Sequence, residues 1–87
     1  MTKTELRRKN IKAVITLLKE TFQAYNIEDS EGGRIMFQID TPIGKTFTGE
    51  FSRSDFDVCF YEKEATNVEI EINKRISEVL LYFQPIN

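Results

Sequence analysis

The chain has 87 residues, of which 40% are hydrophobic, and its formal net charge is −2. A chain of this length can bury one packed core but not two, so we expect a single domain over residues 1–87. Histidine is absent and cysteine occurs once, which excludes an internal disulfide and removes the commonest general base and metal-binding imidazole.

These limits also bear on the class of protein. Without histidine, neither the hydroxyl side chains nor Cys59 has the usual activating base, and Asp57 on the same strand face would raise the pKa of the Cys59 thiol. We therefore expect no enzyme activity, no cofactor and no metal site. The single cysteine predicts a reducing, cytoplasmic location, and the charged N-terminus and short apolar runs predict neither a signal peptide nor a membrane span.

Residues 4–25 are predicted to form a long amphipathic helix. Thr2 and Glu5 have the spacing of a capping box, and no proline or glycine interrupts the segment. Its apolar side chains cover about half of the helix circumference, which indicates burial against a sheet and a second helix. The opposite side carries a basic stripe whose members lie within about 40° of one another. This basic stripe consists of Arg8, Lys12 and Lys19, and it is flanked by Arg7 and Lys9.

Residues 26–33 are predicted to form a loop because they are mostly polar and end in Gly32-Gly33. This glycine pair is not expected to bind phosphate, since we predict neither a strand before it nor a helix N-terminus after it.

Residues 34–61 have a period of two that predicts three antiparallel strands, joined by turns at 41–44 and 52–55. Gly49 interrupts the apolar row of the middle strand, which predicts either a bulge or the close approach of a helix. The apolar row comprises Ile35, Phe37, Ile39, Phe47, Gly49, Phe51, Phe56, Val58 and Phe60.

The segment 66–83 fits two patterns. Its first part, residues 68–72, alternates as a strand would, but apolar residues at helical spacing continue to Phe83. We favour a helix because it explains the whole segment with one element, and because Thr66 and Glu69 fit a second capping box. The predicted fold is therefore α+β, with the order α-β-β-β-α, a three-stranded antiparallel meander, and both helices packed on its apolar face.

This element order resembles that of the double-stranded-RNA-binding domain. The resemblance implies basic residues at the start of the last helix, where that family binds phosphates. Here the stretch 66–71 is acidic, Lys74 and Arg75 come late, and the turn 41–45 does not match the family's loop. No functional residue of that family is therefore transferred to this chain.

Charge is distributed unevenly along the chain. Residues 1–19 carry six bases and one acid, a net +5, whereas residues 20–87 carry six bases and thirteen acids, a net −7. The basic segment predicts nucleic-acid binding through Arg7, Arg8, Lys12 and Lys19, although an acidic body with a pI of about 5.1 would repel the same phosphates. The alternative is a solvated helix face that lies against its own acidic sheet.

The polar face of the predicted sheet is the first candidate for a functional surface. Asp40, Glu50 and Asp57 make this face acidic, and Tyr61 lies beside them, which suits a basic protein partner. An antiparallel sheet also routinely leaves one polar face in water. The second candidate is the pair Ile70 and Leu81, which the helix pattern places together away from the core, where it would bind a protein or form a homodimer.

The first hypothesis is therefore a small, non-enzymatic protein-binding module, an adaptor or inhibitor that uses the acidic sheet face. Its size and acidity suit an accessory protein of a bacteriophage or mobile element. Nucleic-acid binding through the first helix is the alternative.

Overall fold

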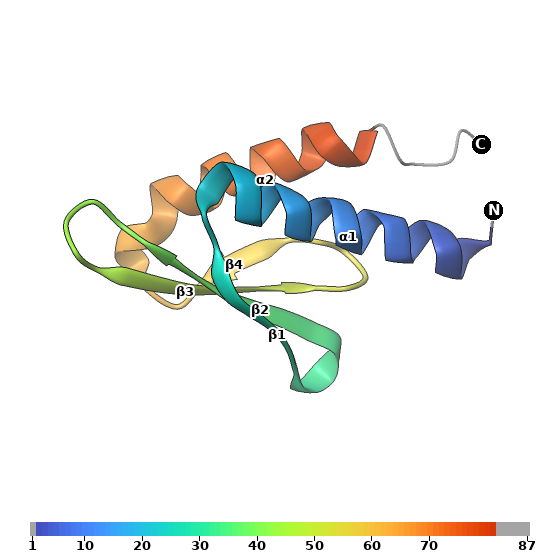
Figure 1. Cartoon of the computed structure of the whole chain (residues 1–87), viewed down its shortest axis with the longest axis horizontal. Helices are drawn as coiled ribbons and strands as arrows, with labels where there is room; N and C mark the ends of the chain where they lie inside the picture. Colours follow the sequence, from blue (N-terminus) through green and yellow to red (C-terminus); the bar gives the residue numbers. More distant parts are fainter. Residues whose placement is uncertain (1, 82–87) are drawn as a thin grey trace.

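The computed structural model describes residues 2–81, without the side chain of Leu81. Within this range the chain forms two helices and one four-stranded antiparallel sheet with the strand order β1-β2-β3-β4 (Figure 1). The helices are α1 (Lys3–Phe22) and α2 (Thr66–Leu81). The strands are β1 (Tyr25–Ser30), β2 (Arg34–Asp40), β3 (Thr46–Ser52) and β4 (Val58–Phe60), and two short 3₁₀ turns are η1 (Glu31–Gly33) and η2 (Lys63–Ala65).

The α+β class is confirmed, but the prediction of three strands is wrong. Residues 26–33, predicted to be a loop, contain most of β1, and Tyr25 belongs to this strand instead of the first helix. The helix ends at Phe22 because Gln23 adopts a left-handed conformation with φ 53°, and the N–H of Ala24 then bonds the Leu18 carbonyl at 2.9 Å. The order is thus α-β-β-β-β-α, so the resemblance to the double-stranded-RNA-binding domain fails at the level of element order.

The predicted alternation is correct for β2 and β3. Ile35, Phe37 and Ile39 are buried, and Phe37 pairs with Gly49, which pairs in turn with Phe60. The third predicted strand is shorter than expected: β4 begins at Val58, because Phe56 has φ 60° and turns the chain while its ring stays in the core. The first turn is confirmed, since the Gly44 N–H donates to the Thr41 carbonyl at 3.0 Å.

The reason why glycine occupies position 49 differs from both predictions. The strand register is continuous on either side of it, so there is no bulge, and its close neighbours are aromatic rings and not a helix. A Cβ atom at this position would lie 2.8 Å from Cζ of Phe37 and 2.9 Å from Cε1 of Phe60. The two rings meet edge to face above the glycine, with their centroids 5.6 Å apart.

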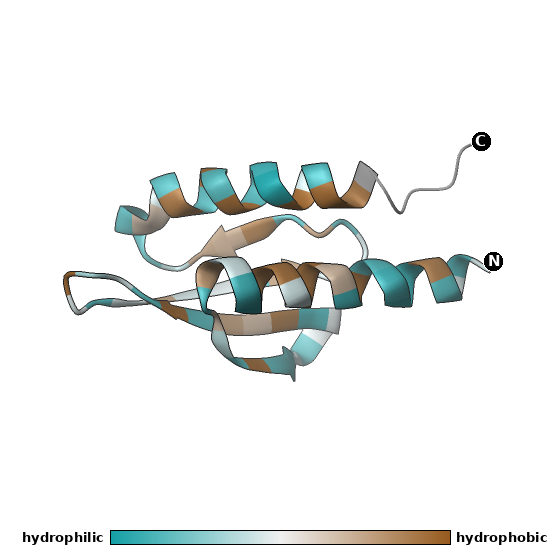
Figure 2. Ribbon diagram, turned by 45° about the horizontal axis from the view of Figure 1, so that its top comes forward, coloured by the Kyte–Doolittle hydropathy of each residue, from teal (hydrophilic) through white to brown (hydrophobic). Residues whose placement is uncertain are grey.

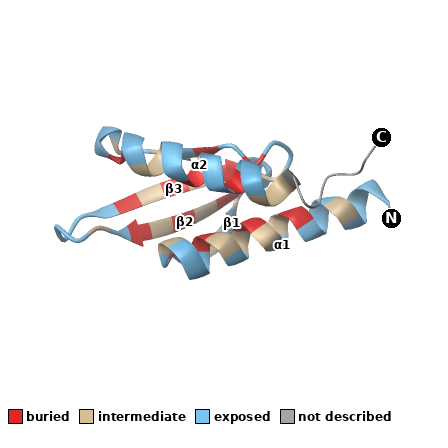
Figure 3. Cartoon of the chain, turned by 90° about the horizontal axis from the view of Figure 1, so that it is seen from above, coloured by how far each residue is buried: buried red, intermediate tan, exposed pale blue. Residues whose placement is uncertain are grey.

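Both helices pack on the apolar face of the sheet. Val14 and Leu18 of α1 and Ile72 and Ile76 of α2 are buried in one cluster with Phe37 and the other core residues of the sheet. The helices run side by side in opposite directions (Figure 3), and apolar and polar residues alternate along each of them (Figure 2). Neither helix of the described region has the length and the apolar composition of a membrane-crossing segment.

The helical interpretation of the last segment is confirmed over residues 66–81, and the predicted end at Phe83 lies outside the described residues. Thr2 caps the first helix, because its Oγ1 accepts the Glu5 N–H at 3.1 Å, which is one of the two hydrogen bonds of the predicted capping box. The second capping box is wrong. The Thr66 hydroxyl donates to the Lys63 carbonyl, and the Glu69 carboxylate accepts the N–H of Phe60 in β4.

Candidate functional site

The face of the sheet opposite the helices is called the open face below. It is built by the side chains that alternate with the buried ones, and register places them in rows across the strands. Its residues are Tyr25, Glu28 and Ser30 of β1, Arg34, Met36, Gln38 and Asp40 of β2, Thr46, Thr48, Glu50 and Ser52 of β3, and Cys59 of β4, with Asp57 and Tyr61 on either side of β4.

The first cluster on the open face surrounds Asp40. The Tyr25 hydroxyl donates to Oδ1 of Asp40 at 2.6 Å, and the Thr46 hydroxyl donates to the same oxygen at 2.8 Å. The hydrogen bond from Tyr25, followed by that from Thr46, lowers the pKa of Asp40. The same contact with Asp40 raises the pKa of Tyr25, so both groups keep the protonation state that their hydrogen bond requires at neutral pH.

The second cluster surrounds Glu50, which is partly buried among its neighbours. Nη1 of Arg34 lies 3.1 Å from Oε1 of Glu50, and the Tyr61 hydroxyl donates to Oε2 at 2.9 Å. The hydrogen bond to Glu50, followed by burial and by the charge of that carboxylate, raises the pKa of Tyr61. Each exposed tyrosine of the open face is thus held by a carboxylate.

The structure places the predicted residues Asp40, Glu50, Asp57 and Tyr61 on one side of the sheet. Two of these acids are already bonded to neighbours. Asp57 is exposed, and within residues 2–81 its side chain makes no hydrogen bond, while its main-chain N–H donates to the Asp55 carboxylate at 3.0 Å. Sequence reasoning missed Tyr25, which came from a segment assigned to the helix. A period-two alternation over 25–30 would have been the signal, but only Ile27 in this strand is apolar beyond its first residue.

Cys59 lies opposite Glu50 on the open face. Desolvation raises the pKa of its thiol, and the charges of Glu69 and Asp57 add to the effect. The predicted influence of Asp57 is therefore present but is not the largest cause. A protonated thiol without an activating base is a poor nucleophile. In the part of the chain that the structure describes, no group of three or more Cys, Asp or Glu side chains is arranged to hold a metal ion.

The basic stripe lies on the other side of the molecule. Arg8, Lys12 and Lys19 are exposed, as are the flanking Arg7 and Lys9, and they project from α1 away from its buried residues. They do not lie against the acidic sheet face, because the sheet separates the two surfaces. The ion pairs within residues 2–81 are Arg34–Glu50, Lys45–Glu64 and Arg53–Asp29, and none of them includes a base of α1.

The predicted apolar pair is placed only in part. Ile70 is 61% exposed on α2, as the helix pattern predicted. Leu81 is the last residue of α2, but its side chain lies outside the described residues. That these two side chains form one patch stays a prediction.

Comparison of the chain with protein-family models, with curated proteins and with solved structures found no match.

Proposed function

We propose that this chain is a small, non-enzymatic protein-binding module, an adaptor or inhibitor, whose open face receives a basic protein. The observation that carries the proposal is the pair of exposed tyrosines that are held by carboxylates: Tyr25 by Asp40 and Tyr61 by Glu50. Their exposed fractions are 38% and 60%. They come from opposite edges of the sheet, so the area between them is available to one partner.

The physical support lies in what tyrosine contributes to an interface. A tyrosine offers a large apolar ring and a polar tip, and it is enriched among the residues that dominate binding energy. Immobilising a free side chain on binding costs about 0.5–1.5 kcal/mol. A ring whose hydroxyl is already bonded has less freedom to lose, so both tyrosines are prepared for contact.

Charge supports a basic partner. Four carboxylates belong to the open face, those of Glu28, Asp40, Glu50 and Asp57, and one base, Arg34. A surface with this excess attracts a positively charged partner and accelerates its association, most strongly at low salt.

The test is a capture experiment followed by affinity measurements. The immobilised chain is used to isolate a partner from the native host, and the purified partner is titrated against two sets of variants. The first set contains two variants. One is the double variant Tyr25→Ala with Tyr61→Ala, and the other is the triple variant with Asp40→Lys, Glu50→Lys and Asp57→Lys. The second set, from the competing apolar surface, is Ile70→Asp with Leu81→Asp.

We expect the first set to weaken binding, and the charge reversals to slow association and reduce its salt dependence. Circular dichroism confirms that each variant is folded. Because Asp57 is exposed and makes no side-chain hydrogen bond within residues 2–81, Asp57→Lys alone serves if the triple variant does not fold. Binding that survives the first set and is lost with the second would make the proposal wrong.

Nucleic-acid binding through α1 is the second candidate. The supporting observation is that the basic stripe is exposed, unpaired within residues 2–81, and separated by the sheet from the acids of the open face. Such binding would weaken steeply with salt and be lost in Arg8→Glu with Lys12→Glu. We expect little binding to single or double strands at physiological salt. A salt-dependent complex tighter than about 10⁻⁶ M would favour this candidate over the first.

A further inference from the structure

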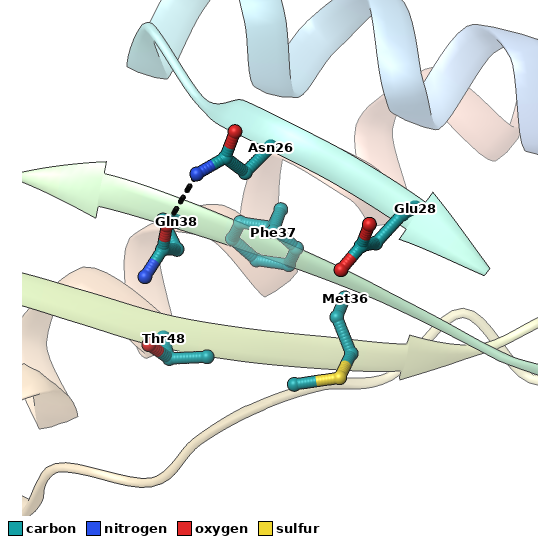
Figure 4. A pocket seen from close by; sticks show the side chains of 6 residues that line it. All are labelled: Asn26, Glu28, Met36, Phe37, Gln38 and Thr48. Atoms are coloured by element: carbon teal, nitrogen blue, oxygen red, sulfur yellow. Dashed lines mark hydrogen bonds between the residues drawn. The ribbon is translucent and has the colours of Figure 1, made fainter. Parts of the chain in front are cut away.

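The open face is hollowed next to its first strand. Tyr25 pairs with Gln38 and Glu28 pairs with Met36, so two residues of β1, Asn26 and Ile27, lie opposite one residue of β2. This is a β-bulge, and Asn26 adopts φ 51° within it. Ile27 packs against the core, while Asn26 is exposed. The bulge leaves a hollow of about 380 Å³ (Figure 4).

The lining of this hollow, called the bulge hollow below, offers acceptors and one negative charge. It consists of Asn26, Glu28, Met36, Phe37, Gln38 and Thr48. Nδ2 of Asn26 donates to Oε1 of Gln38 at 2.7 Å, which fixes both amides and leaves that oxygen a second lone pair. The fully buried Phe37 lies at the floor, between the strands.

Glu28 distinguishes the bulge hollow from the rest of the open face. In Figure 4 its carboxylate lies over Met36 at one end of the hollow. It makes no hydrogen bond or ion pair to another side chain within residues 2–81, unlike Asp40 and Glu50. None of the described residues that line the hollow is a base. An unpaired carboxylate beside fixed amide oxygens is suited to a cation that also donates hydrogen bonds.

We propose that the bulge hollow takes an arginine side chain of the basic partner. This inference rests on the proposed function and makes it specific. A guanidinium group can donate two parallel hydrogen bonds to the Glu28 carboxylate and has donors left for Oε1 of Gln38 or the Thr48 hydroxyl. The flat guanidinium also stacks on planar groups and is weakly hydrated, so it suits amide walls and a thioether better than the compact, strongly hydrated ammonium of lysine does.

The probe for this site is a capped glycine–serine peptide with one central arginine. Matched peptides carry lysine, or citrulline, which keeps the shape of arginine but has no charge. Binding to the isotope-labelled 87-residue chain is followed by amide chemical shifts. We expect the arginine peptide to shift the amides around Glu28, Met36 and Gln38 and to bind at least about threefold more tightly than the lysine peptide, with citrulline weakest.

Two variants lose one charge by the same change, glutamate to glutamine. Glu28→Gln removes the carboxylate of the bulge hollow, and Glu78→Gln removes an exposed carboxylate of α2, outside the open face. We expect Glu28→Gln to weaken the arginine peptide by about tenfold and Glu78→Gln by less than about twofold. Equal effects of the two variants, or equal binding of the arginine and lysine peptides, would overturn the inference.

The captured partner separates this inference from the proposed function. If Glu28→Gln leaves partner binding unchanged while Tyr25→Ala with Tyr61→Ala removes it, the arginine site is wrong and the proposed function stands. If neither change affects binding, the open face is not the interface and both are wrong. We expect both changes to weaken binding.

Discussion

The two edges of the sheet are protected in opposite ways. At β4, the outer main chain is bonded by side chains of α2: Asn73 accepts the Val58 N–H at 2.8 Å and donates to the Val58 carbonyl at 3.0 Å. Glu69 accepts the Phe60 N–H at 2.9 Å. The helix thus takes the place of a fifth strand along this edge, and a partner strand cannot pair there without displacing it.

At β1, the protection is of a different kind. No side chain within residues 2–81 bonds its main chain, and its defence consists of the bulge at Asn26 and the acids Glu28 and Asp29. Bulges and charges deter edge-to-edge pairing without covering the strand. The molecule thus closes one edge of the sheet with its own helix and leaves the other edge accessible, beside the bulge hollow. A partner is therefore expected to approach from the β1 side.

The largest effect is expected when the closed edge is opened. Asn73→Leu removes both hydrogen bonds to Val58 and leaves a partly buried N–H and carbonyl without partners. We expect the free energy of unfolding to fall by about 2–3 kcal/mol, measured by urea denaturation. Lys74→Ala, next to it but exposed, is the control and should change stability by about 0.5 kcal/mol or less. Equal stability of the two variants would mean that α2 does not hold this edge.

A smaller loss is expected at the other contact of the same edge. Glu69→Ala removes the acceptor of the Phe60 N–H and should destabilise the fold by about 1–2 kcal/mol. Glu69→Gln keeps a side-chain oxygen at the same distance from the main chain. The free energy of unfolding should therefore fall by less than half as much as in Glu69→Ala. If glutamine and alanine were equally destabilising in the same urea experiment, this hydrogen bond would not be the reason for the loss.

Substitutions at the open edge should affect self-association more than they affect the free energy of unfolding. Glu28→Thr with Asp29→Thr removes two charges from β1 and should change the free energy of unfolding by about 1 kcal/mol or less. We expect this variant to self-associate more than the natural chain does in sedimentation runs at about 0.15 M salt. Glu71→Thr with Glu78→Thr makes the same charge change on exposed positions of α2 and should not. Identical sedimentation of both variants would mean that the β1 acids do not protect this edge from pairing.

The smallest effect concerns the hydrogen bond from the Tyr25 hydroxyl to Asp40, which joins the start of β1 to the end of β2. Because the pKa of Asp40 is lowered in the folded chain, its ionised form contributes stability above the ordinary aspartate pKa and loses it as the pH falls through the folded pKa. Asp40→Asn should therefore make the decline of stability in acid shallower, measured by urea denaturation at neutral and acidic pH. Asp57→Asn is the control, and an identical slope in both variants would contradict the prediction.

Much of the fold could be predicted because its signals are local. The alternation of Ile35, Phe37 and Ile39, and the helical spacing that includes Ile72 and Ile76, each reflect burial on one face of a single element. The strand β1 could not be predicted in this way. It is an edge strand with a polar sequence, and its place depends on pairing with β2 and on the left-handed residues Gln23 and Asn26.

The candidate site could likewise be predicted only in part. Alternation placed Asp40, Glu50 and Tyr61 on one face, as the structure has them. Their hydrogen-bond partners follow from strand neighbours that no short-range pattern specifies, so the Tyr25–Asp40 contact was not foreseen. The bulge hollow was not foreseen either, because it depends on a backbone conformation at Asn26 that several residue types can adopt.

The sheet has a further consequence, because it separates the basic stripe of α1 from the carboxylates of the open face. The molecule is an electric dipole, positive on the side of α1 and negative across the sheet. Two copies attract most strongly when the helix of one meets the open face of the next. Such a contact joins different surfaces, so it extends into open chains of molecules unless the rotation between copies closes it into a ring. We expect this geometry to favour association of concentrated protein at low ionic strength and to lose that effect at about 0.15 M salt, where charges are screened beyond roughly 8 Å.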